Sequence, residues 1–350
     1  MISDVSLENY RSYQGDSFEF SPGVNIVVGP NASGKTNLIE AILVVSGSTS
    51  YRANDLDLIK FNKPWFKLTS HIGDELRVVK VKKESELKTS KIIEINNKVF
   101  KRLPHKNIKP TVLFEPNQIQ TVVGSPELRR NFIDDILEQI SPNFGLIRRQ
   151  YGRTLAQRNR LLKTSPHQLN SIFVWNVRLS ELGSQIYEVR VELIKKLQAE
   201  IDRLYPEISG KKDNVRLIYR SSVDQAKYGS DLLKKLELNL EKDLMRGFTT
   251  VGAHRDDIEV NFNGHPASEV ASRGECRSLF LVLKVGEAKI IENARDEKPI
   301  MLLDDVFSEL DGHRRLVLTK LMKEYQAFIT TTDADMVVNK LLVNSNIVPL

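Results

Sequence analysis

The 350-residue sequence contains one cysteine, Cys276, and no apolar run near the ~18 residues that span a bilayer. A single cysteine excludes an intrachain disulfide and is typical of proteins in a reducing cytosol. The first residues include Asp4 and lack a long apolar core, so we expect no signal peptide. Internal repeats and low-complexity tracts are also absent. These absences predict a globular cytoplasmic protein without a membrane partner.

The charge is unbalanced only slightly. Lys and Arg number 51 against 45 Asp and Glu, which gives a formal net charge of +6. This excess favours an anionic partner weakly, because many basic proteins bind no polyanion. The length allows two or three domains with a sizeable core.

A complete phosphate-binding loop stands at residues 29–36, between an apolar run at 24–28 and a helical pattern at 37–45. Its glycines let backbone N–H groups surround phosphate oxygens. Lys35 reaches the outer phosphates, and the hydroxyl of Thr36 can bind Mg²⁺. The residues expected to bind nucleotide are Gly29, Pro30, Asn31, Ala32, Ser33, Gly34, Lys35, Thr36 and Asn37.

A second motif is the apolar run 300–303 followed by two carboxylates, Asp304 and Asp305. This is the form of a Walker B strand, in which Asp304 would support Mg²⁺ and Asp305 would orient or deprotonate the attacking water. Buried strands also end in Asp simply because loops are polar. The phosphate loop favours the Walker B interpretation, with Lys35, Asp304 and Asp305 as the catalytic set.

The pattern predicts an α/β nucleotide-binding domain that is split in sequence by a helical insertion. We expect an N-terminal part at 1–122, a helical domain at 123–246 and a C-terminal part at 247–350. Strand patterns are at 66–72, 76–81, 92–95, 111–114, 215–219, 258–262, 300–303 and 327–330, and helical patterns are at 126–205, 232–244 and 275–294. One apolar stripe from Trp175 to Leu204 spans ~45 Å as a helix. Pro142, Pro166 and Pro206 are expected helix boundaries.

Two further segments have a functional and a plain interpretation. Ser272, Gly274 and Glu275 precede a helix and could bind an anion, but Ser272 and Glu275 also have capping-box spacing. The segment from Ser308 to Asp311 follows Walker B and could equally be a helix N-cap.

The order of these motifs resembles the ABC-type P-loop ATPase heads of the SMC and Rad50 class, and within that class the RecF family. The resemblance covers nearly the whole chain. Its segments are Asn9-Tyr10-Arg11-Ser12-Tyr13, the phosphate loop through Ala41, Ser50-Tyr51-Arg52, Gly124 to Arg130, Gln157-Arg158-Asn159, Gly252 to Asp257 and Leu302 to Asp311.

In this family two heads enclose ATP and Mg²⁺. The resemblance therefore implies an ATP-dependent homodimer, in which Ser272 to Glu275 of one subunit caps nucleotide held by Lys35 and Thr36 of the other. It further implies Arg11 and Arg52 as nucleotide contacts, Asp311 and Thr332 as site residues, and Gln118 beside Thr36 and Asp304 at the metal. Three features depart from related ATPases: Asp305 replaces a common Glu, which suits a slow switch; Thr330 to Thr332, with Asp333, replace a His; and Gln118 is a weak match.

A basic segment at 146–163 contains no Asp or Glu, and its expected DNA contacts are Arg148, Arg149, Arg153, Arg158, Arg160 and Lys163. The plain alternative is a helix face paired with acidic neighbours such as Asp134, Asp135 and Glu138. The resemblance implies double-stranded DNA near single-strand gaps and junctions, RecR as a partner and help in loading RecA at the nucleoid. It also implies a slow, DNA-stimulated ATPase. A structural SMC-type head is the alternative, although the insertion lacks a long heptad arm.

The cluster His254-Arg255-Asp256-Asp257 is favoured as a hydrogen-bonded structural corner. Its functional alternative is support of the ATP site or the dimer face.

Overall fold

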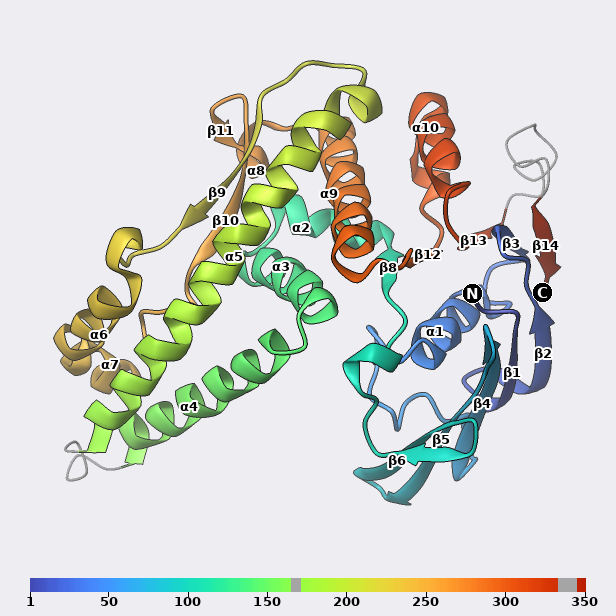
Figure 1. The fold of residues 1–350 in the computed structure, drawn as a ribbon, viewed down its shortest axis with the longest axis horizontal. Helices are drawn as coiled ribbons and strands as arrows, with labels where there is room; N and C mark the ends of the chain where they lie inside the picture. The colour runs from blue at the N-terminus through green and yellow to red at the C-terminus, as the bar shows by residue number, and fades with distance from the viewer. Residues whose placement is uncertain (165–170, 333–344) are drawn as a thin grey trace. The chain divides into compact units, whose positions relative to one another are not determined.

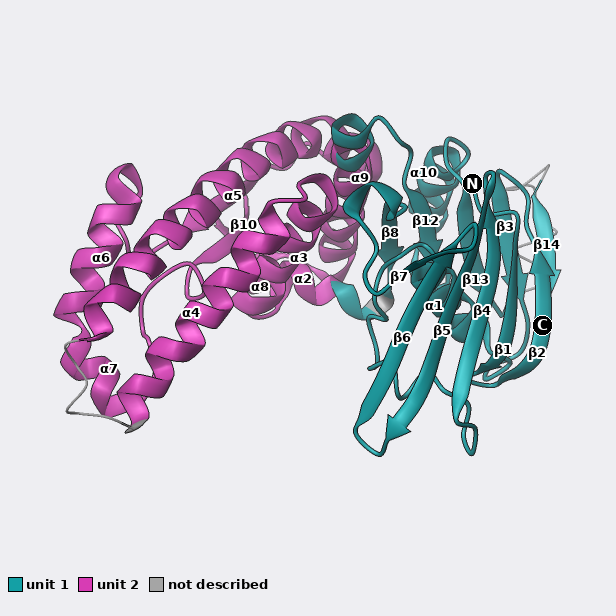
Figure 2. Ribbon diagram, turned by 60° about the horizontal axis from the view of Figure 1, so that its bottom comes forward, with its two compact units in different colours: residues 1–118, 291–350 teal, residues 119–290 magenta. Residues whose placement is uncertain are grey.

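The computed structural model describes residues 1–164, 171–332 and 345–350, and these form two compact units. Unit 1 contains residues 1–118 and 291–350, and unit 2 contains residues 119–290 (Figure 2). The sequence instead assigned residues 247–290 to the ATPase lobe. They belong to unit 2 because strand β10, Asp257–Phe262, pairs antiparallel with β9, Val215–Arg220.

Unit 1 contains a five-stranded parallel sheet in the order β14-β3-β13-β12-β8. Its strands are β3 Val24–Val28, β8 Thr111–Phe114, β12 Ile300–Leu303, β13 Ala327–Thr331 and β14 Asn346–Pro349. The strands β8, β12 and β13 are buried throughout, which explains their continuous apolar patterns. Since the strands are parallel, the segments that follow β3, β12 and β13 meet at one edge of the sheet.

The second sheet of unit 1 has six antiparallel strands in the order β2-β1-β4-β5-β6-β7. They are β1 Asp4–Tyr10, β2 Tyr13–Glu19, β4 Trp65–Ile72, β5 Glu75–Ser85, β6 Lys88–Ile95 and β7 Lys98–Phe100. Strand β4 alternates buried and exposed side chains, as a strand with one covered face should. Strands β5 and β6 are longer than their apolar patterns predicted, because their distal residues are polar and solvated.

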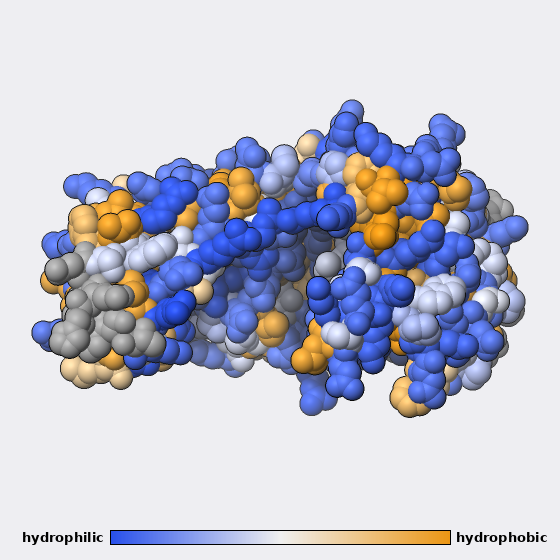
Figure 3. Space-filling model, turned by 90° about the horizontal axis from the view of Figure 1, so that it is seen from below, coloured by the Kyte–Doolittle hydropathy of each residue, from blue (hydrophilic) through white to orange (hydrophobic). Residues whose placement is uncertain are grey.

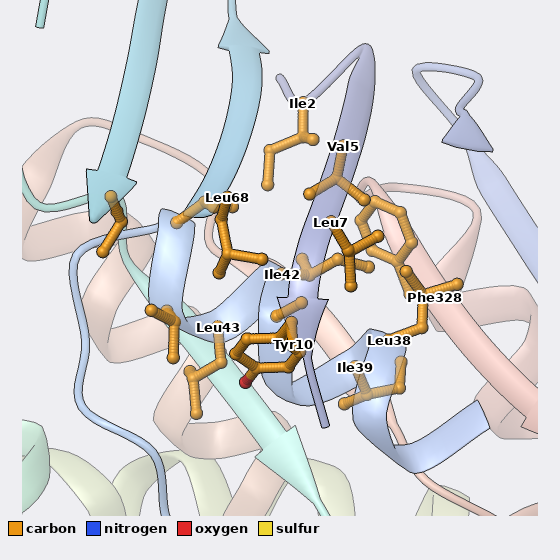
Figure 4. Close-up of a cluster of buried hydrophobic side chains, with 14 of the residues drawn as sticks. Ile2, Val5, Leu7, Tyr10, Leu38, Ile39, Ile42, Leu43, Leu68 and Phe328 are labelled. Atoms are coloured by element: carbon orange, nitrogen blue, oxygen red, sulfur yellow. The ribbon is translucent and has the colours of Figure 1, made fainter. Parts of the chain in front are cut away.

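The core of unit 1 surrounds helix α1, Lys35–Val45, whose residues are buried except Thr36 and Asn37. Figure 4 shows Leu38, Ile39 and Ile42 of α1 among Val5 and Leu7 of β1, Leu68 of β4 and Phe328 of β13. A helix with apolar residues on nearly all of its sides is stable only when it is enclosed in this way. Each fully buried aliphatic side chain contributes roughly 1.5–3 kcal/mol. The core therefore fixes the helix that follows the phosphate loop.

Unit 1 also contains helix α10, Gly312–Met322, and 3₁₀ turns at 105–107 and 307–309. A further 3₁₀ turn at 116–119 crosses the unit boundary after residue 118.

Unit 2 is mainly helical, and its α4 and α5 lie side by side (Figure 1). Its helices are α2 Gln120–Val123, α3 Pro126–Ile140, α4 Phe144–Thr164, α5 Ile172–Ser209, α6 Tyr228–Leu238, α7 Leu240–Arg246, α8 Ala267–Val270 and α9 Arg273–Arg295. The unit boundary at residue 290 falls inside α9. A 3₁₀ turn at 225–227 and strand β11, His265–Pro266, complete the unit.

Two helix boundaries differ from the sequence prediction. Pro206 lies inside α5, in its last turn, where it removes one hydrogen bond and the buried Leu204 and Ile208 still hold the helix to the core. The expected helix 232–244 is two helices, α6 and α7, that meet at Asn239. Pro142 does separate α3 from α4, and Pro166 lies outside the described residues.

Within the described ranges, no helix combines the length and apolarity needed to cross a bilayer. The face drawn in Figure 3 is mostly hydrophilic, with hydrophobic colour in separate patches. Most large apolar side chains are buried in the two units, and exceptions include Phe61, Leu87 and Val99.

Candidate functional site

The phosphate loop connects β3 to α1 and requires glycine at two positions. Gly34 has φ +107, and a Cβ there would lie 2.9 Å from Tyr13 Oη. At Gly29 a Cβ would lie 2.6 Å from Ser33 Oγ. Ala32 also has a positive φ of 66°. The first turn of α1 carries no acidic residue, so the N-terminal N–H groups of the helix are suited to an anion.

Lys35 is 8% exposed, and its ammonium group is held at the loop. Its Nζ donates to the carbonyl oxygens of Gly29 and Pro30, both at 2.8 Å. The cation therefore stands beside the backbone groups that would surround phosphates, as the motif predicts.

Asp304 follows β12 and forms the centre of a short hydrogen-bond chain. Its Oδ1 accepts from Thr36 Oγ1 at 3.0 Å and from Thr330 Oγ1 at 2.8 Å. Thr330 Oγ1 in turn accepts from the N–H of Asp305 at 2.9 Å. The sequence places the run Thr330 to Thr332 at the site and gives Thr332 as the expected nucleotide contact, and in the structure the bond to Asp304 comes from Thr330. Every residue of β13 is buried, so no alternation of burial along the strand distinguishes Thr330 from its neighbours.

The residues at this edge fit a magnesium ion. Thr36 Oγ1 and Asp304 Oδ1 are 3.0 Å apart, which is close to the ~2.9 Å edge of an octahedron with the short bonds that Mg²⁺ requires. In the part of the chain that the structure describes, no cluster of three His, Cys, Asp or Glu could hold a metal by itself. Such a site suits Mg²⁺, which binds through one or two protein groups together with phosphates and waters.

Gln118 and Asp305 differ in their surroundings. Gln118 lies in the 3₁₀ turn after β8, and its Oε1 is buried with no hydrogen-bond partner among the described residues. That oxygen can accept a ligand or cation. Asp305 is exposed and has a left-handed φ of 53°. Strained backbone occurs at active sites and switch regions, and the Asp305 carboxylate is open to water.

The turn between β1 and β2 is bonded to the phosphate loop and its helix. Tyr13 Oη donates to Gly34 O at 3.1 Å, and Asn37 Nδ2 donates to Ser12 Oγ at 3.0 Å. Arg11 forms two hydrogen bonds to Glu40 of α1, at 2.9 and 3.1 Å. These bonds raise the pKa of the Arg11 guanidinium. Neither Tyr13 nor Glu40 belonged to the expected site, because nothing in their spacing distinguishes them from core residues.

Ser272 and Glu275 form the capping box that their spacing allows. Ser272 N and Oγ both donate to Glu275 Oε2 at 2.9 Å, and Glu275 N donates to Ser272 Oγ at 3.3 Å. Lys211 Nζ lies 2.9 Å from Glu275 Oε1, and this bond, followed by those from Ser272, lowers the pKa of Glu275 to about 2. Ser272 is exposed and Gly274 is half-buried. The segment thus caps α9 and still presents its serine to solvent.

Asp311 caps α10 by accepting from the N–H of Arg314 at 2.9 Å, and this bond lowers the pKa of its carboxyl. Thr332 is exposed directly after β13, and Arg52 is exposed in the segment between α1 and β4. Asp333 lies outside the described residues.

The expected DNA contacts on α4 divide into buried and exposed side chains. Arg158 is fully buried and bonds Asp243 at 2.7 Å and Asn176 at 2.7 Å, so it does not fit a role in contacting DNA. Arg148 is half-buried and pairs with Asp135 and Glu138, as the plain alternative foresaw. The remaining four, Arg149, Arg153, Arg160 and Lys163, are exposed at helical spacing along one side of α4.

His254 and its neighbours form a hydrogen-bonded corner in unit 2. His254 Nδ1 lies 2.8 Å from Tyr151 Oη, and its Nε2 lies 3.2 Å from Thr249 O. Burial lowers the pKa of His254 to about 4. Asp256 accepts from three hydroxyl groups, including that of Tyr219 at 2.6 Å. Asp257 accepts two bonds from Arg129 at 2.8 Å.

Two of the solved structures similar to this one have a nucleotide in their description. These two, described as the recombination mediator protein RecF with ATPrS and with ATP in the RecFOR pathway, match with a TM-score of 0.85 at 29% and 30% identity, covering 95% of this chain and 92% of each of those chains. An SMC head bound to the C-winged helix domain of ScpA matches with a TM-score of 0.57 at 16% identity, which supports the fold alone.

Relatives described as RecF are similar to this chain over nearly its whole length. A protein of Acetivibrio thermocellus described as DNA replication and repair protein RecF is 32% identical, covering 97% of this chain and 95% of that protein. One from Streptococcus suis with the same description is 35% identical, covering 95% and 93%. The model of the RecF/RecN/SMC N terminal domain family matches residues 1–347. The chain therefore belongs to the RecF family of DNA replication and repair proteins, with the ABC-type ATPase head fold predicted from its motifs.

Proposed function

We propose that this chain is an ATP-dependent DNA-binding protein that dimerises on double-stranded DNA near single-strand gaps and hydrolyses ATP slowly as a release switch. The observation that carries the proposal is the chain from Thr36 through Asp304 to Thr330 and Asp305, at the mouth of a complete phosphate loop. ATP with Mg²⁺ would supply a polarised γ-phosphate, and departure of the phosphate after hydrolysis would remove negative charge from the site.

Each residue at this edge has a role that follows from its position. Lys35 neutralises phosphate oxygens, while Thr36 Oγ1 and Asp304 Oδ1 provide oxygen ligands for the cation, and Gln118 Oε1 is a further acceptor. Asp305, with its carboxylate exposed to water, orients the attacking water and accepts its proton. The short Asp side chain is suited to slow turnover.

The homodimer is proposed because several expected site residues are exposed. Ser272 and Thr332 face solvent, and Gly274 is half-buried. With Glu275 and Asp311 they would complete the nucleotide site of a second subunit. Binding of one γ-phosphate by two subunits would couple hydrolysis to dimer opening.

For DNA we propose the exposed stripe Arg149, Arg153, Arg160 and Lys163 on α4. No base-reading motif accompanies it, so these cations would contact phosphates and affinity would depend on salt rather than on sequence. Four such contacts give a slope of log affinity against log salt of about −3 to −4.

The proposed protein partners of this chain follow from its membership of the RecF family. Similar structures are described as a recombination mediator in the RecFOR pathway. We therefore propose RecR as a direct partner and RecA loading during recombinational repair and replication-fork maintenance as the result, at the nucleoid in the cytoplasm.

The test is ATP turnover per monomer measured against protein concentration, with and without double-stranded DNA. We expect a slow rate that rises with both, because the active site needs two subunits and DNA brings them together. A rate independent of both would indicate a self-contained monomeric ATPase and would remove the dimer and the DNA switch from the proposal.

A further inference from the structure

Glu40 is a buried carboxylate that the phosphate-loop motif does not use. It lies on α1, five residues after Lys35, and its side chain has no exposed surface. A buried carboxylate destabilises a fold unless hydrogen-bond donors surround it. The identity of its donors therefore indicates what it organises.

The donors come from two segments that are distant in sequence. Arg11 donates Nε to Glu40 Oε2 at 2.9 Å and Nη2 to Oε1 at 3.1 Å. Ser50 Oγ donates to the same Oε1. Arg11 holds a left-handed φ of 50°, a conformation that persists only where surrounding bonds enforce it. One carboxylate thus joins the β1–β2 turn to the segment after α1.

Ser50 transmits this constraint along its own segment. Its Oγ accepts from the N–H groups of Arg52 and Ala53, both at 3.1 Å, which fixes a tight turn at 50–53. Tyr51 follows Ser50 in this turn, and its hydroxyl is buried without a hydrogen-bond partner in the described chain. Burial, and next the carboxylate of Asp304, raise the pKa of the Tyr51 hydroxyl.

We propose that Glu40 is a positioning residue of the nucleotide site: it holds Arg11 and the 50–53 turn against α1, so that both are in place before ATP arrives. The inference rests on the ATP site proposed above. A cation and a turn that are already ordered lose little conformational freedom on binding, and this raises affinity without any contact between Glu40 and nucleotide.

A matched control exists in unit 2. Asp134 is also buried and receives two bonds from one arginine, Arg190, both at 2.8 Å. Asp134→Asn breaks a bidentate buried pair of the same kind in the unit that does not contain the phosphate loop. Loss of stability alone would affect Glu40→Gln and Asp134→Asn similarly, whereas a positioning role affects nucleotide binding only in the first.

The experiment is titration of the full chain with a fluorescent ATP analogue, together with steady-state turnover and urea unfolding for each variant. We expect Glu40→Gln to weaken binding about tenfold or more and to raise KM more than it lowers kcat, while Asp134→Asn leaves nucleotide affinity unchanged. Ser50→Ala keeps the Arg11 pair and frees only the turn, so it should weaken binding less and fold normally.

The outcomes separate the two proposals. If the unmodified chain does not bind the analogue, the ATP site itself is wrong. If the unmodified chain binds the analogue, and Glu40→Gln and Ser50→Ala bind it with the same affinity as the unmodified chain, Glu40 is only a structural residue. If Glu40→Gln does not fold, the Ser50→Ala variant tests the proposal. Unchanged affinity of Ser50→Ala for the ATP analogue would then overturn the positioning role.

Discussion

The hydroxyl of Thr330 donates a hydrogen bond to Asp304 Oδ1 at 2.8 Å. The same hydroxyl oxygen accepts a hydrogen bond from the backbone N–H of Asp305, and this bond orients it. One side chain on β13 thereby fixes both the carboxylate that faces the metal site and the backbone that carries the second aspartate. The geometry at the end of β12 depends on the neighbouring strand as much as on its own sequence.

Thr330→Val keeps the shape of this side chain and removes both hydrogen bonds. We expect kcat to fall roughly tenfold to a hundredfold, since Asp304 and Asp305 lose their alignment. Stability should fall by about 1–3 kcal/mol, because a buried acceptor loses a donor. Turnover and urea unfolding measure the two effects. A Thr330→Val variant that turns over ATP at the rate of the unmodified chain would show that Thr330 does not align the two aspartates.

Lys35→Ala removes the ammonium group from the phosphate loop. We expect it to abolish nucleotide binding and therefore ATP-driven dimerisation, measured by sedimentation velocity with and without ATP. A Lys35→Ala chain that dimerises normally with ATP contradicts the clamp mechanism.

Asp305→Asn should have the opposite effect on assembly. It keeps the size of the side chain and removes the base, so the ATP-bound dimer should persist instead of opening. The measurement is the lifetime of the dimer after ATP is diluted. A lifetime equal to that of the unmodified chain would show that Asp305 does not limit hydrolysis.

Arg158→Ala and Arg153→Ala should separate stability from DNA binding. The first leaves the fully buried Asp243 without its partner, and we expect a loss of about 3–5 kcal/mol in unfolding free energy. The second removes an exposed cation, so stability should hold while DNA affinity falls and the salt slope decreases by about 1. Urea unfolding and DNA titration at several salt concentrations test this. Equal loss of DNA affinity in folded samples of both variants would contradict the assignment of Arg158 to the core.

Residues whose type is required by the local backbone or by the ligand chemistry could be predicted from the sequence. The phosphate loop needs Gly34 because of its positive φ and its contact with Tyr13, and Walker B needs an apolar strand before Asp304. Both requirements leave a short, ordered pattern. The family resemblance then orders the motifs along the whole chain, and the family comparisons confirm it.

What the sequence could not predict depends on contacts between distant segments. Arg158 and Arg153 have the same local pattern, and only packing against Asp243 makes one buried and the other exposed. Residues 247–290 belong to unit 2 because β10 finds its partner in β9, and no local signal specifies that pairing. Glu40 looks like an ordinary helix residue until Arg11 and Ser50 are seen around it.

His254 makes stability depend on pH in a defined range. Burial lowers its pKa from 6.5 to about 4, so between these values the unfolded chain binds a proton that the folded chain does not. The contribution of His254 to the unfolding free energy is fully present above about pH 6.5. It decreases by up to about 3 kcal/mol as pH falls toward 4.

His254→Gln can still bond Tyr151 but does not titrate, so its unfolding free energy should change less between pH 7 and 4.5 than that of the unmodified chain. Comparing the two cancels the carboxylates, which also titrate in this range. Identical curves for His254→Gln and the unmodified chain would mean that His254 is protonated in the folded protein at the same pH as in the unfolded one.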